Sequence, residues 1–175
     1  LHSTNMDFNL SRIKKVASKL NVLKNKPIVF TIAGTNGKGS TVAILESILV
    51  ENEYNVGSYT SPHLISFNER IKINKISAET KEICDAFEII EDARGEISLT
   101  YFEFSTLAAF IIFNKKNLDV IILEVGLGGR LDAVNIIDPD ISIITNIGLD
   151  HTAILGDDPE KIAYEKWLKK NFQDN

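Results

Sequence analysis

The sequence predicts an α/β fold in which a doubly wound, mostly parallel sheet carries helices on both faces. Short runs rich in β-branched residues alternate with longer segments of helical periodicity along its 175 residues. Several of the short runs are apolar throughout, which is typical of parallel strands that are buried on both sides. In such sheets ligands bind at the carboxyl ends of the strands, so the residues that follow each strand are the first candidates for function.

The first half of the chain supplies one unit of this pattern. A helical pattern opens at about Asp7 and keeps apolar residues on one face as far as Leu20. A strand is expected over residues 28–33, followed by a glycine-rich turn and a helix over about 39–53. A second buried strand is expected over residues 56–60.

The second half continues the alternation of strands and helices. Ser77 belongs to the residue types that cap helices, and the helix that it would start runs to Ala93. A further helix over about 101–116 is almost wholly apolar on one side. The β-branched runs at 119–125 and 141–146 are expected to be central strands.

Composition limits the class of protein. With 44% hydrophobic residues the chain can bury one core, and its net charge of -5 without a basic stripe argues against nucleic acid as a partner. No apolar run is long enough for a membrane span. Cys84 is the only cysteine, which excludes a disulfide framework and favours a reducing, cytoplasmic location. The pattern around Cys84 predicts a buried or half-buried thiol.

The turn after the first strand is the most informative segment, and it reads Gly34-Thr35-Asn36-Gly37-Lys38-Gly39-Ser40-Thr41. Glycines let backbone N–H groups approach phosphates, and the helix N-terminus that follows adds partial positive charge. Lys38 adds a mobile cation, and a hydroxyl of Ser40 or Thr41 can reach a magnesium ion or a phosphate. The segment departs from the usual phosphate loop at Ile32 and Gly39, and an ordinary tight turn is the alternative.

Polar residues also lie at the end of, or just beyond, three other expected strands, and they are Ser61, Glu124 and His151. The carboxyl edge of the sheet would bring them to the same crevice as Lys38. Glu124 ends an apolar strand, where an unpaired carboxylate is costly to bury. It is therefore expected to be a magnesium ligand that faces the triphosphate, or else to pair with Arg130. His151 could be a ligand, a base or a solvated loop residue.

Two more segments have both a structural and a functional interpretation. Thr100-Tyr101-Phe102-Glu103 either caps a helix with aromatic residues in the core, or forms a place where a flat aromatic ligand stacks. Asp132 and Asn135 could pair with charges near the crevice or cap a turn.

Together these segments resemble one family closely. The chain is similar to the N-terminal ATPase domain of the dihydrofolate synthase/folylpolyglutamate synthases, which are Mur-ligase-like enzymes that form amide bonds, and within them to the bacterial bifunctional branch. The segments that carry the resemblance are Ala33–Thr41, Thr60–Leu64, Leu99–Phe104, Leu123–Ala133 and Leu149–His151. The fold that it implies is P-loop NTPase-like, of the Mur ligase central-domain type.

The resemblance implies a role for each matching residue. Gly34 to Thr41 would bind ATP, and Lys38 would also be catalytic. Ser61, Glu124 and His151 would be magnesium ligands, and Lys166, if carbamylated, would add a carboxylate for a second magnesium ion. In the family Glu124, His151 and Lys166 therefore match catalytic positions. The pterin substrate would lie against Thr100, Tyr101, Phe102 and Glu103.

The activity that the resemblance implies is ATP-dependent addition of L-glutamate to dihydropteroate and to tetrahydrofolate polyglutamates. A substrate carboxylate would attack the γ-phosphate, giving an acyl phosphate and ADP, and the glutamate amine would then release phosphate. A monomer, with one or two Mg²⁺ ions, is expected. The alternatives that stay open are a non-catalytic ATP-binding remnant and a Mur ligase-type enzyme of peptidoglycan synthesis.

The resemblance covers residues 1–166 and ends after Lys166. Residues 167–175 depart from the family pattern. We therefore expect a partial N-terminal ATP-binding ligase domain at 1–166, a tail at 167–175 and no C-terminal glutamate-ligase domain. The sheet is expected to be incomplete at its C-terminal end, and the chain to be an incomplete, inactive fragment.

Overall fold

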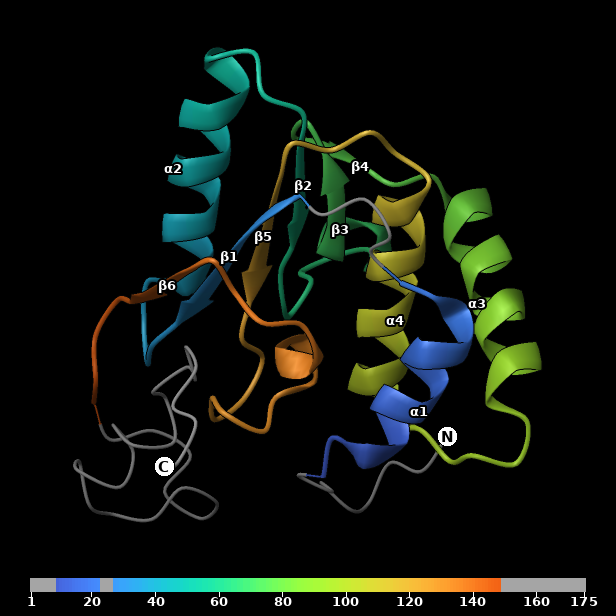
Figure 1. The fold of residues 1–175 in the computed structure, drawn as a ribbon. Coiled ribbons are helices and arrows are strands. Elements are labelled where there is room, and N and C mark those ends of the chain that lie inside the picture. Colours follow the sequence, from blue (N-terminus) through green and yellow to red (C-terminus); the bar gives the residue numbers. More distant parts are fainter. Residues whose placement is uncertain (1–8, 23–26, 149–175) are drawn as a thin grey trace.

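A computed structural model describes residues 9–22 and 27–148 of the chain (Figure 1). Helices and strands alternate along most of this length. The helices are α1 (Ser11–Leu20), α2 (Lys38–Glu51), α3 (Thr80–Arg94) and α4 (Tyr101–Asn114), and the strands are β1 (Ile28–Ala33), β2 (Val56–Tyr59), β3 (Ile71–Ile73), β4 (Ile76–Ser77), β5 (Val120–Glu124) and β6 (Ile141–Ile144). Two short 3₁₀ helices, η1 (Phe67–Arg70) and η2 (Ala133–Ile136), lie in the connections.

The sheet has the strand order β4-β3-β2-β5-β1-β6, and its four strands from β2 to β6 in that order are parallel. Strands β3 and β4 run antiparallel, as a hairpin at the β2 side. The predicted class, a mostly parallel sheet in an α/β fold, is confirmed. In the register, Ile32 of β1 lies opposite Glu124 of β5, and Tyr59 of β2 lies opposite Leu123. The last residues of three strands therefore reach the same edge.

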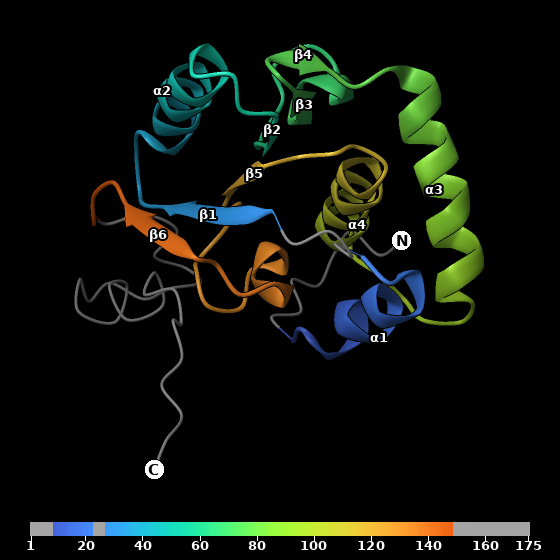
Figure 2. The same cartoon turned by 45° about the horizontal axis from the view of Figure 1, so that its top comes forward.

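Helices cover both faces of the sheet, as predicted. Among the helices of the described residues, Figures 1 and 2 show α2 on one face and α4 on the other, with α1 and α3 packed outside α4. The apolar strand β5 contributes side chains to the hydrophobic clusters on both faces of the sheet. Its Val120 and Ile122 belong to the cluster under α2, whereas Ile121 and Leu123 belong to the larger cluster under α4. A strand that buries both faces has no polar side to alternate, which explains its continuous apolar run.

Several element boundaries differ from the sequence prediction. The helix expected to be capped by Ser77 begins two residues later than expected, because Ser77 pairs with Lys72 in the hairpin. Glu79 is the N-cap instead, and it forms a capping box in which the Glu82 carboxylate accepts from the Glu79 N–H at 3.1 Å. Cys84 on α3 is exposed, so the expectation of a buried or half-buried thiol was wrong.

The β3–β4 hairpin was not predicted at all. Its turn places Asn74 and Lys75 at φ 49° and 70°, in the left-handed region that usually takes glycine. A lysine there gives no turn signal in the sequence. None of the helices within residues 9–22 and 27–148 has the length and apolar character that a membrane crossing requires.

Candidate active site

The glycine-rich loop joins β1 to α2 at the carboxyl edge of the sheet. Gly37 is the N-cap of α2, with φ 81°, and Lys38 is the first residue of the helix. Among the described residues, the backbone N–H groups of residues 37–40 have no acceptor. A row of open N–H groups at a helix N-terminus is suited to bind an anion, and phosphate above all.

Lys38 folds back over the loop instead of extending into solvent. Its Nζ donates to the carbonyl oxygens of Gly34 at 2.9 Å and of Thr35 at 3.2 Å. The Thr41 hydroxyl donates to the carbonyl of Gly37 at 2.9 Å. The hydrogen of the Thr41 hydroxyl is thus in use, so the exposed Ser40 is the hydroxyl that can donate to a phosphate oxygen.

The Glu124 carboxylate lies beside this loop and is 5% exposed. A Cβ added to Gly39 would be 3.8 Å from its Oε2, so the carboxylate is next to the first turn of α2. Its Oε2 accepts from the backbone N–H of Ser61 at 3.2 Å. Burial raises the pKa of Glu124, and the Ser61 N–H and the charge of Lys38 oppose this rise. None of the described contacts of Glu124 involves Arg130, the alternative partner.

The segment after β2 brings Ser61 to the carboxylate. It contains a cis peptide between Ser61 and Pro62. Three successive N–H groups, of residues 64–66, donate to the Glu69 carboxylate at 2.7–3.0 Å. These bonds hold the pKa of Glu69 below its usual value. The buried Arg70 donates through Nε to His63 Nδ1 at 2.8 Å. The loop that carries Ser61 is thus tied to η1 by its own residues.

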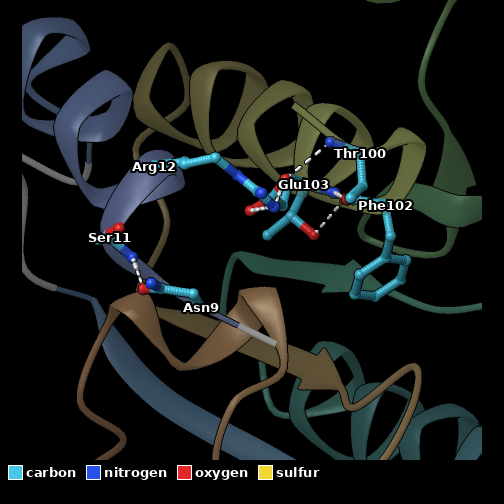
Figure 3. A network of polar contacts seen from close by, with 7 residues as sticks. Asn9, Ser11, Arg12, Thr100, Phe102 and Glu103 are labelled. Atoms are coloured by element: carbon cyan, nitrogen blue, oxygen red, sulfur yellow. Dashed lines mark hydrogen bonds and ion pairs between the residues drawn. The ribbon is translucent and has the colours of Figure 1, made fainter. Parts of the chain in front are cut away.

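The predicted substrate segment starts α4 with a capping box. The Thr100 hydroxyl accepts from the N–H of Glu103 at 3.2 Å, and the Glu103 carboxylate accepts from the N–H of Thr100 at 2.7 Å. Arg12 of α1 reaches the same carboxylate at 3.3 Å (Figure 3). Glu103 is 5% exposed. Its structural role as a cap is thus present, and a role of this segment in substrate binding stays a prediction.

The aromatic residues of this segment point in other directions. In Figure 3 the ring of Phe102 points away from the Glu103 network. It covers Gly126, whose added Cβ would be 2.5 Å from the ring, and its centroid is 5.9 Å from that of Tyr59. Tyr101 is 47% exposed and stacks edge-on against Phe67, while Arg70 lies 5.4 Å from its ring centroid. Phe102 is therefore the member that lies close to the strand tip of Glu124.

Asp132 organises the turn after β5. Its Oδ2 accepts from the N–H groups of Gly126 and Leu127, and its Oδ1 accepts from Val134. Burial nevertheless raises the pKa of Asp132 to about 7, and the negative charge of Glu124 contributes to the rise. The capping alternative for Asp132 is observed.

The structure brings Lys38, Ser61 and Glu124 together at one edge. His151 and Lys166, the other two predicted metal ligands, lie outside the described residues. Within the described part of the chain, no group of three His, Cys, Asp or Glu side chains could hold a metal ion.

The prediction missed two residues that hold the loop, Thr145 and Asn146. Asn146 Oδ1 accepts from the N–H groups of Thr35 and Asn36 at 3.1 and 2.9 Å. The Thr145 hydroxyl donates to the Asn36 carbonyl at 2.6 Å. Their position directly after β6 could have indicated them, because Ser61 and Glu124 also lie at the carboxyl ends of strands.

Comparison with known proteins gives consistent matches. The Mur ligase middle domain family matches residues 32–170. The dihydrofolate synthase/folylpolyglutamate synthase of Buchnera aphidicola subsp. Acyrthosiphon pisum (strain APS) is 58% identical over 159 residues, which are 91% of this chain and 39% of that protein. Its counterpart in Escherichia coli (strain K12) is 53% identical over 95% of this chain and 39% of its own length.

Solved structures agree with these sequence matches. E. coli FolC in complex with DHPP and ADP superposes with a TM-score of 0.92 at 53% identity, over 95% of this chain and 40% of that one. The bifunctional folylpolyglutamate synthase/dihydrofolate synthase of Yersinia pestis, complexed with AMPPNP and a Mn ion, gives a TM-score of 0.89 at 52% identity, over 95% of this chain and 40% of that one. The chain thus spans about two fifths of the length of the relatives that it matches.

Proposed function

The chain belongs to the Mur ligase middle domain family, and we propose that it is the ATP-binding part of a ligase that adds L-glutamate to dihydropteroate and to folate polyglutamates. Relatives named dihydrofolate synthase/folylpolyglutamate synthase, at 58% and 53% identity, support this choice over the peptidoglycan ligases of the same family. Residues 1–166 would form this part, and residues 167–175 would be a tail outside it.

One observation carries the proposal. The open N–H groups of residues 37–40, the ammonium of Lys38 and the carboxylate of Glu124 meet at one edge of the sheet. A triphosphate needs N–H donors and a cation for its oxygens, and its metal ion needs a carboxylate nearby. An ordinary tight turn would require none of these three features.

The residues present fit a magnesium nucleotide. Glu124 is buried, has a raised pKa and has no described cation in an ion pair with it, so a metal ion would compensate the cost of ionising it. We propose that Ser61 and Glu124, with His151 and a carbamylated Lys166, hold one or two Mg²⁺ ions. The oxygen donors Ser61 and Glu124 suit Mg²⁺, which prefers oxygen to nitrogen or sulfur.

ATP, when bound, would supply the phosphoryl group that activates the substrate carboxylate toward glutamate. The chain's own residues would hold the reactants. Residues 37–40 would donate N–H groups to the phosphates. Lys38 would keep two N–H donors on the carbonyls of Gly34 and Thr35 and would donate its third to a phosphate oxygen. Phe102, beside Gly126, would support the pterin ring, and the rest of the segment 100–103 would line the same place.

The remaining expectations belong to the same proposal. We propose a monomer that acts in the cytoplasm, with small molecules as its only partners and neither nucleic acid nor a membrane involved. The net charge of -5 supports the exclusion of nucleic acid.

The test is a titration of the chain with AMPPNP and Mg²⁺, followed by an assay of phosphate release with ATP, dihydropteroate and L-glutamate. We expect AMPPNP to bind only weakly without Mg²⁺. Phosphate release that needs both dihydropteroate and glutamate would support the ligase. Nucleotide binding without such release would identify an ATP-binding part that is inactive by itself, and no binding of AMPPNP would overturn the proposal.

A further inference from the structure

We infer that Asn146 is a positioning residue for Lys38 and acts on it through two peptide groups of the loop. The inference rests on the proposed function in one respect, which is that Lys38 binds a nucleotide phosphate. Asn146 directly follows Thr145 beyond β6 and is separated from the loop by more than a hundred residues of sequence.

The side-chain oxygen of Asn146 accepts two consecutive backbone N–H groups. The N–H of Thr35 lies 3.1 Å from Oδ1, and the N–H of Asn36 lies 2.9 Å from it. The backbone carbonyl of Asn146 also accepts from the Thr35 N–H at 3.1 Å. One residue therefore fixes the hydrogen-bonding direction of two neighbouring peptide groups.

The opposite ends of the same two peptide groups hold Lys38. The peptide that supplies the Thr35 N–H supplies the Gly34 carbonyl, and the peptide that supplies the Asn36 N–H supplies the Thr35 carbonyl. These are the two carbonyls that accept from Lys38 Nζ, at 2.9 and 3.2 Å. In a trans peptide the N–H and the C=O point in opposite directions. Asn146 thus aims both carbonyls at the ammonium, and each hydrogen bond polarises the next.

Thr145 fixes the third peptide group in the reverse sense. Its hydroxyl donates to the Asn36 carbonyl at 2.6 Å, so the N–H of Gly37 in that peptide points away from β6. The reversal is possible because Gly37 has φ 81°. The N–H groups of the loop therefore fall into two sets. Those of Thr35 and Asn36 donate to Asn146, and those of residues 37–40 stay open for a ligand.

The packing between the loop and the end of β6 is tight. A Cβ added to Gly34 would overlap Thr145 Oγ1, and Gly34 has φ 144°. The Thr35 hydroxyl accepts from the N–H of Gly148 at 2.9 Å. The position of Asn146 is thus fixed from both sides.

The first test uses the nucleotide-free chain. In Asn146→Ala we expect amide hydrogen exchange at Thr35 and Asn36 to accelerate by at least about tenfold, and the slowly exchanging ¹⁵Nζ signal of the Lys38 ammonium to be lost. Asn146→Asp keeps an acceptor oxygen in the same place and should retain both signals. Asn52→Ala removes a side-chain hydrogen bond to Ile48 at the far end of α2 and serves as the matched control.

The second test is a double-mutant cycle on the affinity for AMPPNP with Mg²⁺. Asn146→Ala should weaken binding roughly tenfold, but less than about twofold in a Lys38→Met background, because its effect runs through Lys38.

Equal losses in both backgrounds, or unchanged exchange at Thr35 and Asn36, would overturn the inference. If the wild type does not bind AMPPNP, the proposed function falls, and the exchange and ammonium signals alone decide the inference. Should Asn146→Ala not fold, Asn146→Ser, whose hydroxyl is too short to reach both N–H groups, replaces it.

Discussion

The backbone N–H of Ser61 donates to Glu124 Oε2 over 3.2 Å, and this bond joins the tips of the neighbouring strands β2 and β5. The bond orients the buried Glu124 carboxylate. Because the donor is a backbone N–H, the bond does not depend on the side chain at position 61. The Ser61 hydroxyl is therefore not consumed in holding Glu124. A main-chain donor for the carboxylate and a hydroxyl on the same residue are consistent with a shared metal site.

Replacing Glu124 by Gln removes the charge and keeps the size of the side chain. We expect the Mg²⁺ dependence of AMPPNP binding to disappear, with affinity at saturating Mg²⁺ falling to the metal-free value. In the wild type, protons compete with the metal at a carboxyl whose pKa is raised, so Mg²⁺ affinity should decrease as the pH falls. Titrations across pH measure both effects. Glu51→Gln, at an exposed glutamate of the same chain, is the control. An unchanged Mg²⁺ dependence in Glu124→Gln would remove this residue from the metal site.

Gly34→Ala should destabilise the fold strongly. The new Cβ would overlap Thr145 Oγ1 at a backbone position with φ 144°, and we expect a loss of roughly 3 kcal/mol in the free energy of unfolding. Gly95→Ala is the matched control, because Gly95 also has positive φ (53°) but has no atom within 4 Å of the new Cβ. Its cost should be about 1–2 kcal/mol, from backbone strain alone. Urea unfolding of both variants separates the overlap from the backbone strain, and equal losses would contradict a tight loop.

The sequence was most informative about elements whose pattern is local. The strand expected over residues 28–33 is β1 with the same bounds, and the helix expected over 101–116 is α4, which ends at Asn114. The β3–β4 hairpin was missed because its turn has Asn74 and Lys75 at positive φ without a glycine. Ser77 was taken for a helix cap because a cap and a strand end use the same small polar residues.

The same distinction between local patterns and distant contacts applies to the residues of the candidate site. Lys38 and Glu124 were predicted to share an edge from the general rule for parallel sheets, and the register of β1 and β5 confirms it. Asn146 was missed because its role depends on hydrogen bonds across 110 and 111 residues of sequence. Such a contact leaves no periodicity in the chain.

Asp132 should make stability depend on pH. Its pKa in the folded state is about 7, compared with an ordinary value of 3.8, so the folded protein binds the proton more tightly than the unfolded chain. The stabilisation is complete below pH of about 4 and is lost as the pH rises to about 7, by up to roughly 4 kcal/mol. Asp132→Asn should remove this slope from plots of unfolding free energy against pH. The exposed Asp138→Asn should keep it, and the same pH dependence in Asp132→Asn as in the wild type would refute the prediction.

Thr100→Ala tests the cap of α4. The variant loses the acceptor for the Glu103 N–H, and we expect the free energy of unfolding to fall by about 1 kcal/mol. Thr100→Ser keeps the hydroxyl and should restore stability. Thermal unfolding measures this effect, and binding of dihydropteroate measures the substrate role separately. A Thr100→Ser protein that is stable but binds dihydropteroate poorly would show that the threonine methyl contacts substrate. Full stability of Thr100→Ala would contradict the capping role.

The most direct test of the central claim follows the backbone amide NMR signals of the ¹⁵N-labelled chain during titration with AMPPNP and Mg²⁺. A triphosphate at the loop should shift the signals of residues 37–40 most strongly, and Lys38→Met should weaken the binding by at least about tenfold. Shifts centred elsewhere, or an affinity that Lys38→Met leaves unchanged, would contradict the assignment of this loop as the phosphate site.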